Sequence, residues 1–201
     1  MVTTAERIAV FEELAGSVPD PELPVVTLAE LGVVRRVGEP EPGHVEVELT
    51  PTYTGCPAIE AMASDIEGAL REGGAERVTV RTVLTPPWST DDITAEGRRK
   101  LAEHGVAPPR HSSAAEAPVL LGLSPTRRTA ASEPTPGSEP APGSLPAPGP
   151  ESGNAPGPEP VRCPNCGSAE TTLLARFSST ACKALRRCEF CREPFDHFKE
   201  V

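Results

Sequence analysis

The sequence predicts an α+β protein: a small mixed sheet with helices on one face, then a proline-rich linker, then a small cysteine-bearing domain. Three observations support this. Residues 1–105 alternate helical and strand patterns in the order α-β-β-α-β-α. Residues 132–160 hold ten prolines and five glycines in 29 positions, without an aromatic or basic residue. Five of the six cysteines follow Arg162.

The first helix is predicted from its start signal and its apolar spacing. Thr3 and Glu6 have the spacing of a capping box. Ile8, Phe11 and Leu14 follow at helical intervals and form one apolar face. We expect Gly16 to end this helix.

A hairpin is expected next. Residues 25–37 are rich in β-branched side chains and favour a strand. Residues 38–43 contain glycine and proline and favour a turn. Apolar and polar residues then alternate over 44–49, as in a half-buried strand.

A second helix should begin at Pro57 and end at Gly73, because its apolar residues recur at helical spacing. Residues 78–83 favour a third strand, and 89–104 a short final helix capped near Ser89. These elements complete a domain predicted to span residues 1–105.

Residues 106–160 are expected to form a disordered linker. Within them, residues 132–149 contain three copies of a hexapeptide with two prolines and a final glycine, which favours extended segments broken by hinges. We expect residues 106–160 to connect the two domains without binding a partner themselves.

Charge and cysteine usage limit the function classes. The formal net charge is −10, although residues 161–201 carry seven basic and five acidic side chains. This balance argues against a general nucleic-acid-binding surface. Neither a signal peptide nor a long apolar run is evident, so we expect a cytoplasmic protein that does not bind membranes. In that compartment thiols stay reduced, which favours metal binding over disulfides.

The strongest motif is a pair of CxxC sequences separated by 21 residues, a spacing typical of a zinc ribbon. Its predicted ligands are Cys163, Cys166, Cys188 and Cys191. Residues 161–201 offer too little apolar material to fold without a metal, so the zinc is expected to be structural. Cys182 is an additional candidate ligand, which leaves an iron-sulfur or redox site as an alternative, and His197 is a candidate replacement ligand.

Cys56 is isolated from the other cysteines and lies beside the predicted start of the second helix. Unpaired backbone N–H groups and the helix dipole at such a position lower the pKa of a thiol. An accessible thiolate there could bind iron or attack an electrophile. The alternative is a small buried side chain without chemistry.

Asp20 and Glu22 lie in a loop bracketed by prolines. They are candidate oxygen donors near a metal, or residues that only cap the neighbouring backbone. Phosphate-binding loops and catalytic triads are absent from the sequence, so an independent enzyme is not expected.

Two regions resemble known families. Asp20-Pro-Glu22, Leu31-Gly-Val-Val34 and Thr52-x-x-x-Cys56-Pro57 resemble the SufT-type iron-sulfur assembly family over about residues 5–105. The segments at Cys163–Ser168, Phe177–Leu185 and Cys188–Phe195, with Pro87–Asp92, resemble the PaaD family, also called PaaJ.

The resemblance implies a non-catalytic accessory protein that matures the metal centres, iron-sulfur or diiron, of the oxygenase that epoxidises phenylacetyl-CoA. It implies that Cys56 contacts iron or a transient cluster, with Asp20 and Glu22 beside it, and that the four CxxC cysteines bind zinc. Subunits of that oxygenase, either its reductase or its diiron subunit, are the implied partners. Because the linker is long, we expect the two domains to act at a distance from each other.

Two other functions remain open at this stage. Basic residues around the CxxC motifs would suit a zinc ribbon that binds nucleic acid or serves only as an interaction module. Cys56 would suit a thiol enzyme, although the sequence shows no general base for it.

Overall fold

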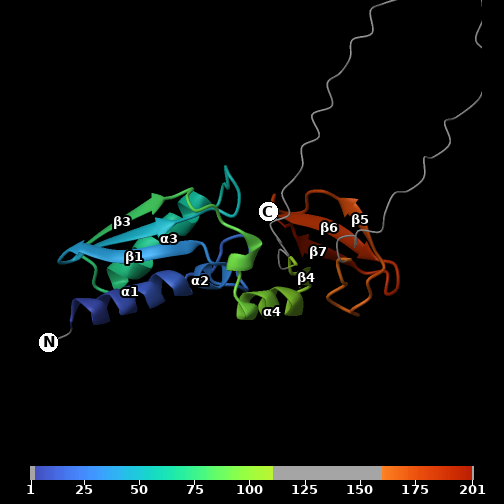
Figure 1. The fold of residues 1–201 in the computed structure, drawn as a ribbon, viewed down its shortest axis with the longest axis horizontal. Coiled ribbons are helices and arrows are strands. Elements are labelled where there is room, and N and C mark those ends of the chain that lie inside the picture. Colours follow the sequence, from blue (N-terminus) through green and yellow to red (C-terminus); the bar gives the residue numbers. More distant parts are fainter. Residues whose placement is uncertain (1–2, 111–159, 201) are drawn as a thin grey trace, which may run out of the picture. The chain divides into compact units, whose positions relative to one another are not determined.

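The computed structural model describes residues 3–110 and 160–200 (Figure 1). Their elements are, in chain order, α1 (Thr4–Ser17), α2 (Leu28–Leu31), β1 (Val34–Glu41), β2 (His44–Leu49), α3 (Ile59–Glu72), β3 (Arg77–Thr82), a 3-10 turn η1 (Thr90–Asp92), α4 (Ala95–Glu103), β4 (Val106–Ala107), β5 (Thr171–Ala175), β6 (Lys183–Cys188) and β7 (Pro194–Phe198). The predicted linker and its repeats lie almost entirely outside the described residues.

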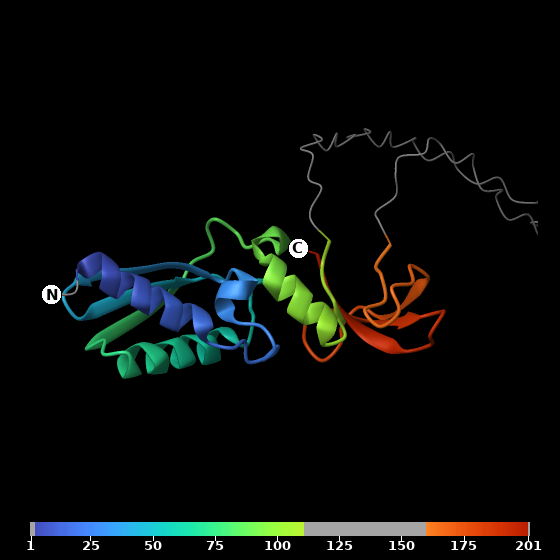
Figure 2. The same cartoon turned by 90° about the horizontal axis from the view of Figure 1, so that it is seen from below.

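The first sheet is mixed, as predicted, with the order β1-β2-β3. β2 pairs with β1 as an antiparallel hairpin and with β3 in parallel. Val45, Val47 and Leu49 alternate with partly exposed residues and form the buried face of β2. α1 contacts β1, α3 contacts β3, and the two helices contact each other, so both cover that face (Figure 2).

The capping box of α1 is confirmed: the Thr3 side chain accepts from the Glu6 backbone, and the Glu6 side chain accepts from the Thr3 backbone. The predicted stop at Gly16 is wrong, because α1 continues through Ser17. Gly16 is instead buried at the contact with α2, where an added Cβ would lie 2.9 Å from the Ala29 Cβ. Its role is close packing of two helices.

The first strand is shorter than predicted. Part of the β-branched stretch forms the short helix α2, capped by Thr27 and Glu30 and ended by Gly32, whose φ is 69°. β1 then begins at Val34. Local capping therefore overrides strand propensity here.

The C-terminal domain is a sheet of order β4-β7-β6-β5. Strand β6 pairs antiparallel with both β5 and β7. β4 belongs to the segment after α4, assigned from the sequence to the linker, and pairs in parallel with β7. The residues just after the predicted boundary at residue 105 are therefore part of the folded C-terminal sheet.

The expectation that the two folded regions act at a distance is wrong. Residues 1–112 and 159–201 form one compact unit. Cys182 and Phe198 of the C-terminal region belong to the main hydrophobic core together with residues of α1, α3 and the first sheet. The Trp88 ring lies 5.9 Å from the Phe198 ring, centroid to centroid. The shared core buries apolar surface that the small C-terminal sheet could not cover by itself.

None of the helices in the described parts of the chain combines the length and apolar character needed to cross a membrane.

Candidate metal centres

The four CxxC cysteines gather at one end of the C-terminal sheet. Their sulfur atoms all lie within 4.8 Å of one another. The Cys163 and Cys191 sulfurs are 3.7 Å apart, and those of Cys166 and Cys188 are 3.5 Å apart. Among residues 3–110 and 160–200, this is the one group of three or more metal-ligating side chains that comes so close.

Each CxxC motif forms the same backbone turn. The Gly167 amide donates to the Cys163 carbonyl at 2.9 Å, and the Arg192 amide donates to the Cys188 carbonyl at 3.0 Å. Both residues that follow a motif have positive φ, 74° at Gly167 and 67° at Arg192. The two turns therefore aim both thiols of each motif inward.

The sulfur spacing fits zinc. A tetrahedral ion with Zn–S bonds of about 2.3 Å requires neighbouring sulfurs roughly 3.8 Å apart, close to the spacing observed. Although burial opposes it, backbone hydrogen bonds from Cys191 and Phe190 lower the pKa of Cys188 to about 6, which favours its ligating thiolate form. At Cys191 a backbone hydrogen bond from Glu193 acts in the same direction, but burial and the neighbouring thiols outweigh it and raise the pKa to about 12, so this thiol keeps its proton until a metal ion displaces it. Zinc held there by four thiolates would cross-link the ribbon and leave no position open for catalysis.

Cys56 lies in the loop before α3, three residues ahead of the first helical residue. The helix cap is Ala58, and it makes no side-chain capping bond. The Cys56 side chain is only 5% exposed and belongs to the main core. The prediction of an accessible thiol at the helix N-cap is therefore wrong.

The predicted pKa shift at Cys56 is also reversed. Burial raises the pKa of this thiol, and the negative charges of Glu22 and Asp20 raise it further. A backbone hydrogen bond from Ala58 and a hydrogen bond with the Tyr53 hydroxyl act in the opposite direction without cancelling the burial effect. The Cys56 thiol thus holds its proton at neutral pH when no metal is bound.

The carboxylates of Asp20 and Glu22 have different contacts. The Asp20 Oδ1 accepts from the backbone amides of Glu22, at 2.8 Å, and Leu23, at 2.7 Å, so this carboxylate fixes the loop. Glu22 is partly buried, and burial and the neighbouring Asp20 charge raise the pKa of its carboxyl. Its Oε2 lies 4.0 Å from the Cys182 sulfur.

Cys182 therefore faces the Cys56 region and stands outside the group of four ribbon cysteines. It is 8% exposed, and burial raises the pKa of its thiol.

The sequence did not predict that Cys182 lies near Glu22, and it did not identify Tyr53 or Lys183 as neighbours of this site. Burial and then the negative charge of Cys56 raise the pKa of Tyr53 to about 12. Tyr53 is three residues before Cys56, a spacing that a turn brings together.

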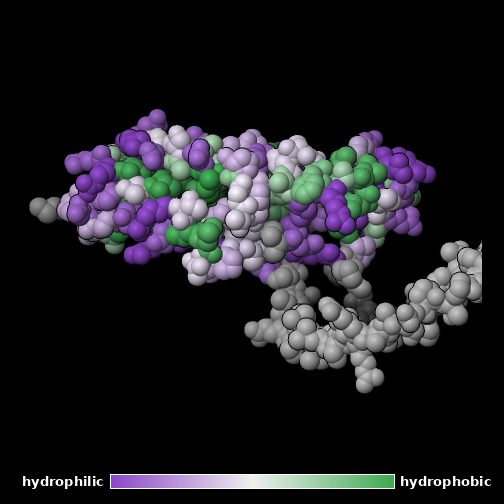
Figure 3. Space-filling model, turned by 90° about the horizontal axis from the view of Figure 1, so that it is seen from above, coloured by the Kyte–Doolittle hydropathy of each residue, from purple (hydrophilic) through white to green (hydrophobic). Residues whose placement is uncertain are grey.

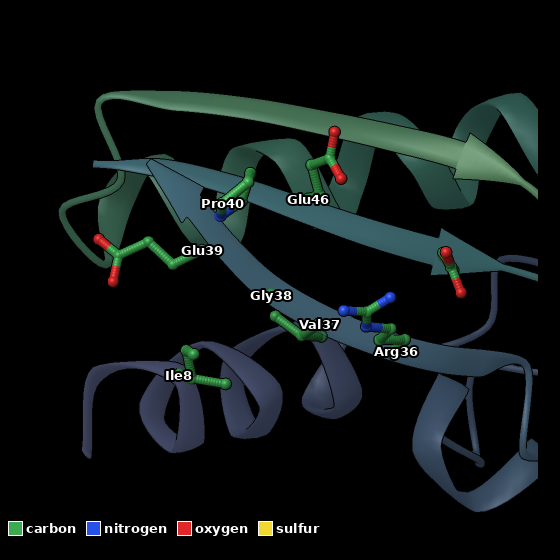
Figure 4. A pocket seen from close by; sticks show the side chains of 8 residues that line it. Ile8, Arg36, Val37, Gly38, Glu39, Pro40 and Glu46 are labelled. Atoms are coloured by element: carbon green, nitrogen blue, oxygen red, sulfur yellow. The ribbon is translucent and has the colours of Figure 1, made fainter. Parts of the chain in front are cut away.

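A pocket of about 270 Å³ lies elsewhere, between α1 and β1 (Figure 4). Ile8 and Val37 form its apolar side, and Arg36, Glu39 and Glu46 add charged groups. None of its lining residues is a cysteine or belongs to the loops around Cys56. It therefore adds no ligand to either metal centre.

Comparison with known proteins assigns both regions. Residues 9–82 match the family "Iron-sulfur cluster assembly protein", and residues 147–199 match the "PaaD zinc beta ribbon domain". The chain is 40% identical over 187 residues, 92% of its length and 88% of the relative's, to a subunit of the Escherichia coli K12 "Putative 1,2-phenylacetyl-CoA epoxidase".

Shorter relatives cover the first region. The Bacillus subtilis "Fe-S protein maturation auxiliary factor YitW" is 32% identical over 90 residues, 43% of this chain and 87% of that protein. A crystal structure of a domain of unknown function, DUF59, from Bacillus anthracis is 26% identical, with a TM-score of 0.46, and covers 49% of this chain and 93% of that one.

The fold and the four-cysteine ribbon define a two-part class of protein, an iron-sulfur cluster assembly domain joined to a zinc beta ribbon. Within that class, the chain belongs to the PaaD family of 1,2-phenylacetyl-CoA epoxidase subunits. The resemblance inferred from the sequence motifs is confirmed.

Proposed function

We propose that this protein matures the metal centres, iron-sulfur or diiron, of the oxygenase that epoxidises phenylacetyl-CoA, and that Cys56 contacts the iron or cluster in transit. One observation carries the proposal: a ribbon with four clustered cysteines and a cysteine-bearing iron-sulfur assembly domain share one chain, and the ribbon residues Cys182 and Phe198 reach from beside the ribbon's own small core into the core of the assembly domain. The names of the relatives, an epoxidase subunit and a maturation factor, support both halves of this role.

Burial of Cys56 is compatible with this role. A raised thiol pKa keeps the sulfur protonated, and therefore poorly reactive, until a metal ion displaces the proton. The Tyr53 hydroxyl can hydrogen-bond the sulfur once it is ionised. Gly55, directly before Cys56, is exposed and has a φ of 85°, so the loop presents bare backbone to solvent beside the buried thiol. We infer that the protein carries metal without turnover of its own.

A protein partner is supported by the surface of the ribbon. Leu173, Leu174, Phe177 and Phe190 are large apolar side chains that remain exposed, and hydrophobic residues gather over this domain in Figure 3. Large apolar side chains that stay exposed are candidates for contacts with other proteins. A subunit of the oxygenase is the partner that the family membership favours.

Nucleic-acid binding has less support, because three of the seven basic residues of the ribbon are engaged in ion pairs within it. Arg187 and Arg192 both pair with Glu189, and the buried Lys183 pairs with Asp196 at 3.2 Å. Arginine and lysine side chains that bind nucleic acid must be free to contact its phosphates.

The test is co-expression of the oxygenase subunits with the wild-type chain or with a Cys56→Ser variant. We expect the variant to keep its fold, because serine differs from cysteine by one atom, and to yield oxygenase with several-fold less iron per molecule. Thr54→Ala, an exposed change in the same loop, is the matched control. Oxygenase with full iron content and activity in the Cys56→Ser background would refute the proposal.

A further inference from the structure

Cys182 is the one ribbon cysteine outside the group of four, and its buried sulfur lies 3.0 Å from the Thr180 hydroxyl. It directly precedes β6, and its backbone carbonyl accepts from the Lys199 amide at 2.9 Å, which fixes the loop to the end of β7. Its side chain leaves the ribbon and enters the same core as Cys56. The Glu22 carboxylate beside it is 160 residues away in the sequence.

Glu22 connects the two thiols electrostatically. Its negative charge raises the pKa of Cys56 and of Cys182, and both thiols raise the pKa of Tyr53. The acidic groups facing one another here are Asp20, Glu22, Tyr53, Cys56 and Cys182.

Lys183 is the cation that lowers the pKa of Asp20, Glu22 and Cys182, and its ammonium is already paired with Asp196. The geometry that joins these groups is the 4.0 Å approach of the Glu22 Oε2 to the Cys182 sulfur, and the core that Cys182 shares with Cys56.

We propose that Cys182 is a second sulfur ligand, which joins Cys56 and Glu22 in one site for an iron-sulfur cluster carried between the two domains. This inference rests on the proposed function. It adds that the protein carries an iron-sulfur cluster and that the ribbon supplies one ligand to it, Cys182. Zinc folds the ribbon, and the folded ribbon holds Cys182 against the assembly domain.

The spacing of the ligand atoms favours a cluster over a single ion. Within the described residues, only the four ribbon cysteines lie close enough together to surround one ion. Cys56, Cys182 and Glu22 are more widely spread, and a cluster distributes its ligands over more than one iron.

Two thiolates are fewer than the four that hold a stable cluster. Open positions on the irons would let a client protein's ligands take the cluster. When an assembled cluster binds, two Fe–S(Cys) bonds replace two bonds from iron to its previous ligands, the two thiol protons pass to solvent, and no oxidation state changes.

The experiment is anaerobic reconstitution of the full-length, zinc-loaded chain with Fe³⁺, sulfide and a thiol that supplies any electrons the cluster needs, followed by measurement of iron, acid-labile sulfide and zinc per chain. We expect wild type to hold a cluster, and Cys182→Ser and Cys56→Ser each to hold at least tenfold less while keeping one zinc. Ser179→Ala, an exposed change in the loop of Cys182, is the matched control and should behave as wild type.

Alkylation of the unmodified chain gives a second measurement that needs no variant. Mass spectrometry should show Cys56 and Cys182 labelled slowly in the zinc-loaded protein and protected once the cluster is added. A Cys182 that is equally reactive with and without cluster would overturn the inference, as would a Cys182→Ser chain that holds as much iron and sulfide as wild type.

The two proposals fail in different ways. Full iron in the oxygenase despite loss of the cluster from Cys56→Ser and Cys182→Ser would overturn the maturation function alone. A cluster that depends on Cys56 but not on Cys182 would overturn only the shared site. A wild-type chain that takes up no iron would overturn the inference at once.

Discussion

At Cys56, the burial that raises the thiol pKa also couples metal loading to proton release. A group whose pKa is raised by burial is protonated at neutral pH, so iron must replace a proton in order to bind. Lower pH restores that proton and opposes loading, whereas higher pH favours it until the pH passes the pKa.

We therefore predict that the iron affinity of the zinc-loaded chain rises with pH, by about tenfold per unit for each thiol proton released. Competition with an iron chelator at several pH values between roughly 6 and 9 measures this slope. Cys56→Ser should lower the slope by one proton. An affinity that does not change over this range would show that the bound sulfur is already ionised.

The local sequence around Cys56 did not determine the protonation state of its thiol. Spacing alone identified Cys56, Asp20 and Glu22 as chemical candidates and placed them on loops, where the structure finds them. The protonation of Cys56 depends on Glu22 and on the surrounding core, which are distant in the chain. The position of Cys56 before α3 says nothing about its burial by distant residues, and that burial is the main cause of its raised pKa.

At the scale of elements, the contact between α1 and α2 depends on the absence of a side chain at Gly16. We predict that Gly16→Ala destabilises the protein by about 1–3 kcal/mol, because the new methyl group would overlap Ala29. Gly68→Ala in α3 is the matched control, since no atom lies within 4 Å of its added Cβ.

Alanine at Gly68 should stabilise α3 by about 0.5–1 kcal/mol through its higher helix propensity. Urea denaturation followed by circular dichroism measures both changes. Equal effects from the two variants would mean that the α1–α2 contact is looser than described.

Elements with strong local signals were predicted correctly. Capping at Thr3, the alternation in β2 and the helical spacing in α3 all act within a few residues. The errors fall where distant contacts compete with local preference. A β-branched stretch became the helix α2, and the two-residue strand β4 exists only because β7 pairs with it.

At the scale of the whole molecule, Trp88 reports on the joint core. It is the one tryptophan in the chain, its Nε1 donates to the Leu31 carbonyl at 2.8 Å, and its ring packs near Phe198. Phe198 is 1% exposed, so its ring is fully covered by the assembly domain and the ribbon. Fluorescence of Trp88 therefore monitors whether the two regions are docked.

We predict that Phe198→Ala costs about 3–5 kcal/mol of stability and shifts the Trp88 emission to longer wavelength, because water reaches the exposed indole. Phe190→Ala is the control, since that ring is 76% exposed and should leave the emission unchanged. An unshifted spectrum in Phe198→Ala would contradict the joint core.

The sequence by itself determined the α+β class of the first region, the four zinc ligands, and the family, because each is encoded in short-range patterns or in motifs of fixed spacing. Only the tertiary structure decided that the ribbon packs on the assembly domain and brings Cys182 toward Glu22 and Cys56. Such a contact gains its free energy from apolar surface buried between segments more than a hundred residues apart, and no local pattern specifies which surfaces will meet.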